Sequence, residues 1–242
     1  MGLLQDAATL RRLLFTRVRG DSHRERLDAF YRGQAAGYDN FRKRLLQGRE
    51  SLIERLPLTP GAIWIDLGGG TGANIAMAGD RLNHLAKIHL VDLCPSLVTV
   101  AKKRAEDAGW ANVEVVEGDA TQWRPAEGLA DVVTFSYSLT MIPDWFLAIN
   151  HALSLLRPGG TIGIVDFYVS RKFPAARRAK HPWLHRTFWP TWFAADNVWL
   201  SPDHLPYLSA STEPVFVQES LAKVPYFPFL RVPYYQYLGR KI

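Results

Sequence analysis

The sequence predicts an α/β protein built around a doubly wound, mostly parallel sheet. Between about residues 60 and 168, short β-branched runs alternate with helix-compatible stretches. The runs are apolar throughout, as expected for parallel strands that helices cover on both faces. The chain has 242 residues, of which 48% are hydrophobic and 21% charged. These values fit one domain with insertions and exclude disordered and collagen-like chains.

Five segments have the composition of buried strands, and two more candidates follow near the end of the chain. The first five are Ala62–Leu67, Lys87–Asp92, Val113–Val116, Asp131–Phe135 and Thr161–Phe167. Helices are expected between them at Gly72–Leu85, Pro95–Ala108 and Pro143–Leu156. The two later strands, Pro214–Leu221 and Arg231–Leu238, would complete a seven-stranded sheet at its edge.

Helical patterns precede the first strand. Residues 3–18 have apolar positions every three or four residues, which predicts an amphipathic helix. This helix packs on its own domain or lies on an anionic membrane, and the sequence leaves both open. Further helices are expected at Ser22–Ala36, with Ser22 as the cap, and at Asn40–Leu56, which Pro57 ends.

The excess of positive charge belongs to one segment. Lys and Arg number 29 against 23 acidic residues, yet residues 167–195 contain six cations and no acid. The six are Arg171, Lys172, Arg177, Arg178, Lys180 and Arg186. Four of the eight tryptophans lie in the adjoining segment His181–Trp199. Interleaved aromatic and basic residues are typical of a membrane interface, and a packed lid is the equally open alternative.

Cysteine and histidine usage argues against a disulfide or a metal site. Cys94 is the single cysteine, which excludes an intrachain disulfide and fits a reducing cytosol. His181 and His185 are four residues apart, but Pro182 separates them and no third ligand is evident, so we expect no metal. Asp6 and several arginines near the start argue against a secretory signal, and no apolar window is long enough to span a bilayer.

A glycine-rich loop, Asp66-Leu-Gly-Gly-Gly-Thr-Gly72, directly follows the first strand. Gly68, Gly70 and Gly72 permit a tight turn and a close approach of the backbone to a ligand at a helix N-terminus. The dinucleotide fingerprint would require a further glycine at position 73, where Ala73 stands. With Asp66 two residues before Gly68, the loop instead resembles that of class I S-adenosylmethionine-dependent methyltransferases.

Further residues sit where this resemblance requires them. It implies that Asp92, at the end of the second strand, binds the two ribose hydroxyls of the cofactor. Asp119 would receive the adenine amino group, Ala120 would serve a ring nitrogen through its backbone N–H, and Ser136 completes the expected cofactor-binding set. The turn Leu156–Gly160 also matches and has a structural role. Each acid alone could equally be a cap or turn residue, but their order favours the methyltransferase.

Other segments resemble a narrower group, the N-methyltransferases of betaine-lipid synthesis, which convert diacylglyceryl-homoserine to its trimethylammonium form. The matching segments are Phe30–Asp39, Phe188–Pro190, Ala195–Trp199 and Arg231–Tyr235. The resemblance implies that Tyr38 and an arginine close over the methionine end of S-adenosylmethionine. Arg49 is preferred for this arginine, with Arg42 and Arg44 as alternatives. A partner enzyme that makes the homoserine lipid is also implied.

Methyl transfer to an amine needs positioning and the removal of a proton rather than a covalent nucleophile. Asp166, at the end of the fifth strand, and the tyrosines Tyr31 and Tyr137 are candidate bases or orienting residues. Core packing is an equally open role for Tyr31.

The expected organisation has four parts. Residues 1–59 form helices over the cofactor site, 60–168 the α/β core, 169–211 an aromatic and basic insertion, and 212–242 the last strands of the same sheet. We expect a cytoplasmic enzyme, peripherally associated with an anionic membrane surface, that methylates a lipid amine. The alternatives are another phospholipid amine, a soluble small molecule, or a catalytically silent S-adenosylmethionine-binding partner protein. An Asn-Pro-Pro-Tyr-type loop is absent from the sequence, and no nucleic-acid partner is expected.

Overall fold

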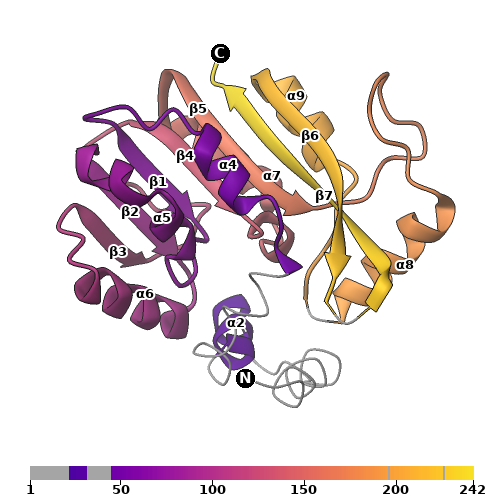
Figure 1. The fold of residues 1–242 in the computed structure, drawn as a ribbon, viewed down its shortest axis with the longest axis horizontal. Coiled ribbons are helices and arrows are strands. Elements are labelled where there is room, and N and C mark those ends of the chain that lie inside the picture. Colours follow the sequence, from indigo (N-terminus) through magenta and orange to yellow (C-terminus); the bar gives the residue numbers. More distant parts are fainter. Residues whose placement is uncertain (1–21, 32–44, 196, 226) are drawn as a thin grey trace.

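The computed structural model describes residues 22–31, 45–195, 197–225 and 227–242. Its centre is a seven-stranded sheet with the strand order β3-β2-β1-β4-β5-β7-β6 (Figure 1). The strands are β1 Ile63–Leu67, β2 Lys87–Asp92, β3 Val113–Glu117, β4 Ala130–Ser136, β5 Leu156–Phe167, β6 Glu213–Val224 and β7 Phe227–Arg240. The helices are α2 His23–Tyr31, α4 Arg49–Arg55, α5 Ala73–Met77, α6 Pro95–Asp107, α7 Trp145–Leu155, α8 Trp183–Ala194 and α9 His204–Ser211, with 3-10 turns η1 Gly79–His84 and η2 Leu139–Met141.

The sheet is parallel from β3 to β5 and antiparallel at the other edge, where β7 pairs with β5 and β6 pairs with β7. The expected doubly wound, mostly parallel fold is therefore confirmed. From β1 the chain runs outward to β2 and β3, then returns to place β4 on the other side of β1. In open α/β sheets, ligands bind outside the carboxyl ends of the strands at such a switch point.

Helices cover both faces of the sheet, and the strand residues alternate between two apolar layers. Trp64 and Leu90 pack in the layer that also holds residues of α4, α5 and α6. Phe135 and Ile164 pack in the opposite layer with residues of α7 and α9. Both faces of the central strands are therefore buried, which explains why these segments are apolar in sequence.

Glycines interrupt two of the expected helices. Within the expected helix at residues 40–56, α4 begins at Arg49, directly after Gly48, which has a φ of 83°. A Cβ on Gly48 would lie 2.6 Å from the Tyr234 ring, so the chain also passes close to β7 here. The expected helix at residues 72–85 divides into α5 and η1 at Gly79, which has a φ of 56°. Left-handed residues end a right-handed helix.

The segment at residues 169–211, expected as an aromatic and basic insertion, contains the two helices α8 and α9. Each includes a proline, Pro190 in α8 and Pro206 in α9. Aromatic residues also stand around α8, which hides its apolar stripe in the sequence. Strands β6 and β7 extend further into the intervening segment than predicted and form a long hairpin whose far end lies beside α8 (Figure 1).

Several expectations fall on residues outside the described ranges. They are the helix at residues 3–18, the second half of the helix at 22–36, and the side chains of Tyr38, Arg42 and Arg44. Within the described ranges, none of the helices combines the length and the apolar character needed to cross a bilayer.

Candidate functional site

The glycine-rich loop leaves β1 at the switch point of the sheet. Gly68, Gly70 and Gly72 have φ values of 68°, 59° and 77°, in the region that side-chain-bearing residues rarely adopt. A Cβ on Gly68 would overlap the side chain of Ser138, which follows β4. The Ser138 hydroxyl donates a hydrogen bond to the Leu67 carbonyl over 3.0 Å. The ends of β1 and β4 are thus in direct contact beneath the loop.

Asp66 lies under this loop rather than on its surface. Its carboxylate is fully buried and accepts hydrogen bonds from Thr134 Oγ1 at 2.6 Å and Asn74 Nδ2 at 3.1 Å. Burial raises the pKa of Asp66 to about 6. Because Asn74 belongs to the first turn of α5, Asp66 fixes that helix to β1 and β4. Expected as a cofactor-binding residue, it acts in this geometry as a residue that positions the loop.

Asp92, the last residue of β2, joins the loop to the next helix. Its Oδ2 accepts a hydrogen bond from the Gly70 N–H, and its Oδ1 accepts one from the Cys94 N–H, each over 2.8 Å. These bonds fix the orientation of the carboxylate. The residue also lines the pocket that opens above the loop.

This pocket encloses about 550 Å³, including the solvent at its mouth. Its lining includes Gly68 and Gly70 of the loop, Asp92 at the end of β2, and Tyr137 and Ser138 after β4. The remaining lining comes from α2, from the residues after β2 and β3, and from η2, namely His23, Leu27, Tyr31, Leu93, Leu97, Gly118, Ala120, Met141 and Ile142. The pocket therefore occupies the place where ligands bind in this class of fold.

Some of the residues after β3 line the pocket, and others lie beside the lining residues. Ala120 lines the pocket with Gly118. Asp119 is not among the lining residues. Its Oδ1 accepts hydrogen bonds from the backbone N–H and the hydroxyl of Thr121, at 2.8 and 2.7 Å, and its charge acts on the lining residue His23. Ser136, at the end of β4, is buried just behind the lining residues Tyr137 and Ser138. Its hydroxyl has no hydrogen-bond partner among the residues that the structure describes.

Tyr137 faces the pocket with a left-handed backbone, at a φ of 53°. Non-glycine residues in this conformation are strained and cluster at functional sites. Its phenol donates a hydrogen bond to the Gln47 carbonyl over 2.6 Å. Burial, and then the nearby Asp166, raise the pKa of Tyr137. A phenol that keeps its proton is a poor base, so this geometry favours an orienting role over the alternative of a base.

Asp166 is the candidate base or orienting residue near the end of β5. It is fully buried and absent from the pocket lining. Its carboxylate accepts hydrogen bonds from Thr140 Oγ1 at 2.7 Å, Thr140 N at 3.2 Å and Phe167 N at 2.8 Å. Burial raises its pKa to about 7. Asp166 therefore holds η2 against β5 and does not touch the pocket.

Tyr31 lines the pocket, whereas Arg49 does not. Tyr31 lines the pocket and packs in a small apolar cluster with Cys94 and Leu97. Both of its open roles, packing and orienting, are compatible with this placement. Arg49 is buried at the start of α4, and its Nε donates a hydrogen bond to the Leu46 carbonyl over 3.4 Å. It is not among the pocket-lining residues.

A second hollow adjoins the pocket and shares His23, Leu27 and Met141 with it. It is completed by residues that include Arg26 of α2 and Trp199, whose backbone N–H donates to the Thr140 carbonyl over 2.7 Å. Sequence reasoning missed His23, Met141 and Ser138. For Ser138 a signal was available, because the polar run Ser136–Ser138 directly follows an apolar strand at the switch point.

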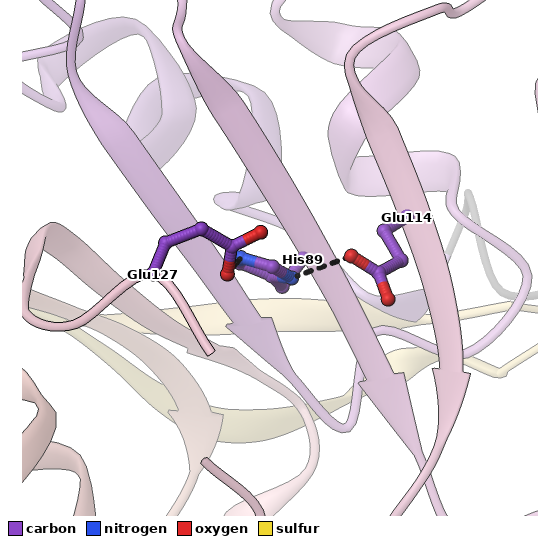
Figure 2. Close-up of side chains that lie close together, drawn as sticks. All are labelled: His89, Glu114 and Glu127. Atoms are coloured by element: carbon purple, nitrogen blue, oxygen red, sulfur yellow. Dashed lines mark ion pairs between the residues drawn. The ribbon is translucent and has the colours of Figure 1, made fainter. Parts of the chain in front are cut away.

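Three side chains of metal-binding types also lie close together, namely His89 of β2, Glu114 of β3 and Glu127, which precedes β4 (Figure 2). The buried His89 ring faces Glu114 through Nδ1 at 3.4 Å and Glu127 through Nε2 at 3.3 Å. One ligand atom from each of the three side chains lies within 4.8 Å of the other two, so the cluster could hold a metal ion. The Lys87 ammonium lies 3.0 Å from Glu114 and 4.0 Å from Glu127, where it already supplies a positive charge. Burial lowers the pKa of His89, so the ion pairs of this cluster are those between Lys87 and the two glutamates.

Comparison with known proteins agrees with this architecture. The family model described as "Methyltransferase domain" matches residues 65–160, from β1 into β5. The ubiquinone/menaquinone biosynthesis C-methyltransferase UbiE of Vibrio cholerae is 26% identical over 159 residues, which cover 63% of this chain and 61% of that protein. The UbiE of Shewanella sediminis is 29% identical over 116 residues, covering 48% and 46%. The chain thus matches about three fifths or less of the length of these relatives.

Solved structures share the fold at low sequence identity. Phosphoethanolamine N-methyltransferase 2 of Haemonchus contortus superposes with a TM-score of 0.69 at 14% identity, covering 92% of this chain and 60% of that chain. The YcgJ protein of Bacillus subtilis gives a TM-score of 0.63 at 15% identity, covering 80% and 97%. The [4+2]-cyclase SpnF has the same fold, with a TM-score of 0.62 at 19% identity over 80% and 79% of the two chains. The fold is therefore that of class I methyltransferases, and it also carries other chemistry.

Proposed function

We propose that this protein is an S-adenosylmethionine-dependent N-methyltransferase that acts on the amine of a lipid headgroup, with diacylglyceryl-homoserine as the acceptor. The observation that carries the proposal is the pocket at the switch point of the sheet. The glycine loop and Asp92 line that pocket together with Tyr137 and Ser138. The methyltransferase domain match contains all of these residues.

The cofactor is S-adenosylmethionine, which carries a methyl group on a positively charged sulfur. The pocket fits this nucleoside in three respects. The loop lacks a Cβ at Gly68, where a side chain would meet Ser138. The carboxylate of Asp92 is held at the wall, suited to ribose hydroxyls. The residues Gly118 and Ala120 form an adjoining wall suited to the adenine ring.

The protein residues supply positioning and a route for a proton. In-line displacement requires the acceptor nitrogen to be held on one axis with the reacting carbon. The adjoining hollow gives the acceptor a path to the pocket beside Met141. We assign His23 as the residue that receives the ammonium proton, because it borders both spaces. Burial, and then Arg26, lower its pKa, so its imidazole is neutral at pH 7.

The assignment of His23 predicts a specific kinetic defect. His23→Gln keeps a polar side chain but removes the base, so turnover at pH 7 should fall about 100-fold, the lower range for general base catalysis. Cofactor binding should change little. Turnover is measured over pH 6 to 9, where the loss should shrink as more of the amine is deprotonated in solution. A variant with unchanged turnover would contradict the assignment.

The exposed aromatic and basic residues support a lipid acceptor. Trp183 at the start of α8 is 70% exposed and Phe229 on β7 is 96% exposed. Trp192 of α8 and Phe227 of β7 lie 6.3 Å apart between ring centroids, so these two elements form one end of the molecule. The six cations of residues 171–186 precede or lie in α8. Large apolar side chains beside cations suit an anionic membrane surface.

A C-methyltransferase is the second candidate, because the UbiE relatives carry that activity in their name. The two functions differ in the atom that receives the methyl group. The protein is incubated with methyl-labelled cofactor and vesicles that contain diacylglyceryl-homoserine, and the lipids are analysed by mass spectrometry. We expect mono-, di- and trimethylated headgroups, and no product with Asp92→Asn. Label on a quinone precursor supplied in parallel would favour the second candidate, and binding without any product would favour a silent partner protein.

A further inference from the structure

Another large hollow lies apart from the pocket, between the segment that follows β5, helix α9 and strand β6. It encloses about 460 Å³ of water-accessible space and shares no lining residue with the pocket. Pockets for small molecules measure roughly 300 to 1,000 Å³. The space is therefore large enough for an extended ligand.

Most of its lining is apolar. Phe173, Pro174, Ala175 and Ala176 form one side, and Pro206 and Ala210 of α9 belong to the other. Small and proline side chains leave an open apolar trough of the kind that an aliphatic chain fills. Phe173 is also 77% exposed, which leaves its ring available to cover a ligand.

Three charged side chains border the trough, and two of them have hydrogen-bond partners. Arg171 Nε donates to Asp203 Oδ1 over 2.6 Å. The Glu219 carboxylate accepts a hydrogen bond from the Tyr168 hydroxyl at 2.7 Å and another from the Ala179 N–H at 3.0 Å, and it keeps its negative charge. The half-buried guanidinium of Arg178 has neither a hydrogen bond nor an ion pair among the residues that the structure describes. Within that part of the chain, the trough therefore has one guanidinium without a partner beside an apolar surface, in a segment, residues 171–180, that carries five cations and no acid.

The segment that presents Arg178 is built for this placement. Arg177 has a φ of 64°, a left-handed conformation that is strained for an arginine. The Arg178 N–H closes the turn on the Ala175 carbonyl over 3.1 Å. At the base of the segment, the Ser170 N–H donates to His181 Nδ1 at 3.0 Å, and the His181 N–H donates to Ser170 Oγ at 2.8 Å. The loop is thus tied at its base and turned so that Arg178 faces the trough.

We propose that this trough binds a single-chain anionic amphiphile, a carboxylate or phosphate on an aliphatic chain. Its anionic head pairs with Arg178, which can offer two parallel N–H donors to such a group. The chain lies along Phe173, Ala176 and Pro206. This site is additional to the proposed methyl transfer and does not depend on it, because the two spaces have separate linings.

The test is isothermal titration calorimetry with sodium dodecanoate below its critical micelle concentration. Arg178→Gln should weaken binding about 10-fold or more, the loss of a charged hydrogen-bonding partner. Lys180→Gln is the matched control, because Lys180 is an exposed cation two residues away that does not line the trough. Ala210→Phe should also weaken binding by filling the trough from the exposed side of α9. Asp92→Asn, in the separate pocket, should leave dodecanoate binding unchanged.

Dodecyl phosphate should bind like dodecanoate, and dodecyltrimethylammonium should not bind. Thermal unfolding of each variant checks that it is folded, so a loss of binding is read only on folded protein. The proposal is overturned if dodecanoate does not bind the wild type, or if Arg178→Gln and Lys180→Gln weaken binding equally. Binding to phosphatidate vesicles without binding of the monomeric amphiphiles would also overturn it, because the charge would then serve a membrane surface instead of a pocket.

Discussion

Two aspartates near the ends of strands, Asp92 of β2 and Asp166 of β5, differ in what their carboxylates contact. Asp92 lines the pocket and accepts backbone N–H groups from both the glycine loop and the residue before α6. Asp166 is sealed behind η2 and bonded to Thr140 and Phe167. Substitution of the first should therefore affect ligand binding, and substitution of the second should affect stability.

Asp92→Asn should weaken the binding of S-adenosylhomocysteine about 10- to 100-fold, the range for a lost hydrogen bond to a charged group. Calorimetry below the unfolding temperature measures the change. Asp107→Asn is the control, because Asp107 pairs with Lys103 on the exposed surface of α6. Equal affinities for the wild type and Asp92→Asn would show that the carboxylate does not contact the ligand.

Asp166 predicts a pH dependence of stability. Burial raises its pKa from 3.8 to about 7 in the folded protein, so between these values the folded state retains a proton that the unfolded state has lost. The contribution of Asp166 to the unfolding free energy should therefore fall as pH rises from about 4 to 7, by at most about 1.4 kcal/mol per pH unit.

Urea unfolding of the wild type and Asp166→Asn across this pH range isolates the effect. The wild type should lose stability relative to the variant as pH rises, and Asp66, which is present in both, largely cancels. Parallel curves for the two proteins would mean that Asp166 ionises normally in the folded state.

At the scale of residues, the sequence predicted which residues lie near the switch point better than it predicted which side chains line the pocket there. Asp92, Ala120, Gly68 and Gly70 line the pocket as expected from their places after strands. Asp66 and Asp166 sit near the ends of strands too, but their side chains turn into the interior toward Thr134 and Thr140. That direction depends on the register between strands, which a motif does not encode.

At the scale of elements, the sequence located strands better than the ends of helices. Those ends depend on glycine conformations that the sequence alone does not assign. Strands could be located because β-branched runs of five or six residues have few alternatives. The helices α8 and α9 could not be located from the sequence, since Pro190 and Pro206 break the usual helical pattern of apolar residues. In α8, the tertiary contact of Trp192 with Phe227 supports the helix. Gly48 and Gly79 interrupt two expected helices, because a left-handed residue breaks the helix although the apolar pattern continues.

A matched pair of substitutions tests the glycine loop, with Gly61, which lies outside the loop, as the control. Gly61 and Gly68 both have positive φ, at 78° and 68°, but a Cβ meets nothing within 4 Å at Gly61 and collides with Ser138 at Gly68. Gly61→Ala should lower the unfolding free energy by about 1 to 2 kcal/mol, the strain of the left-handed backbone. Gly68→Ala should lower it further and abolish S-adenosylhomocysteine binding, as measured by urea unfolding and calorimetry. Equal losses of stability would mean that the loop relaxes freely around the added methyl group.

At the scale of the whole molecule, the pocket and the exposed aromatic residues occupy different regions of one sheet. The pocket lies at β1 and β4, whereas α8 and the far end of the β6–β7 hairpin form an end of the molecule (Figure 1). The sheet order was predictable because alternating strands and helices allow few topologies. The function of the aromatic end was not, because the same composition suits a packed lid or a membrane contact.

The side chains of α8 differ in exposure: Trp189 is buried, as in a packed lid, while Trp183 and Leu184 are exposed and available to a membrane. If the exposed pair contacts lipid, Trp183→Ala with Leu184→Ala should reduce sedimentation with phosphatidylglycerol vesicles at least about 10-fold, since each side chain contributes roughly 1.5 to 3 kcal/mol on burial. Leu147→Ala on α7, also exposed, is the control. Binding should weaken at 1 M salt, where the screening length falls to about 3 Å. Salt-independent binding, or equal binding by the double variant and the control, would assign this end of the molecule to a role other than contact with an anionic membrane.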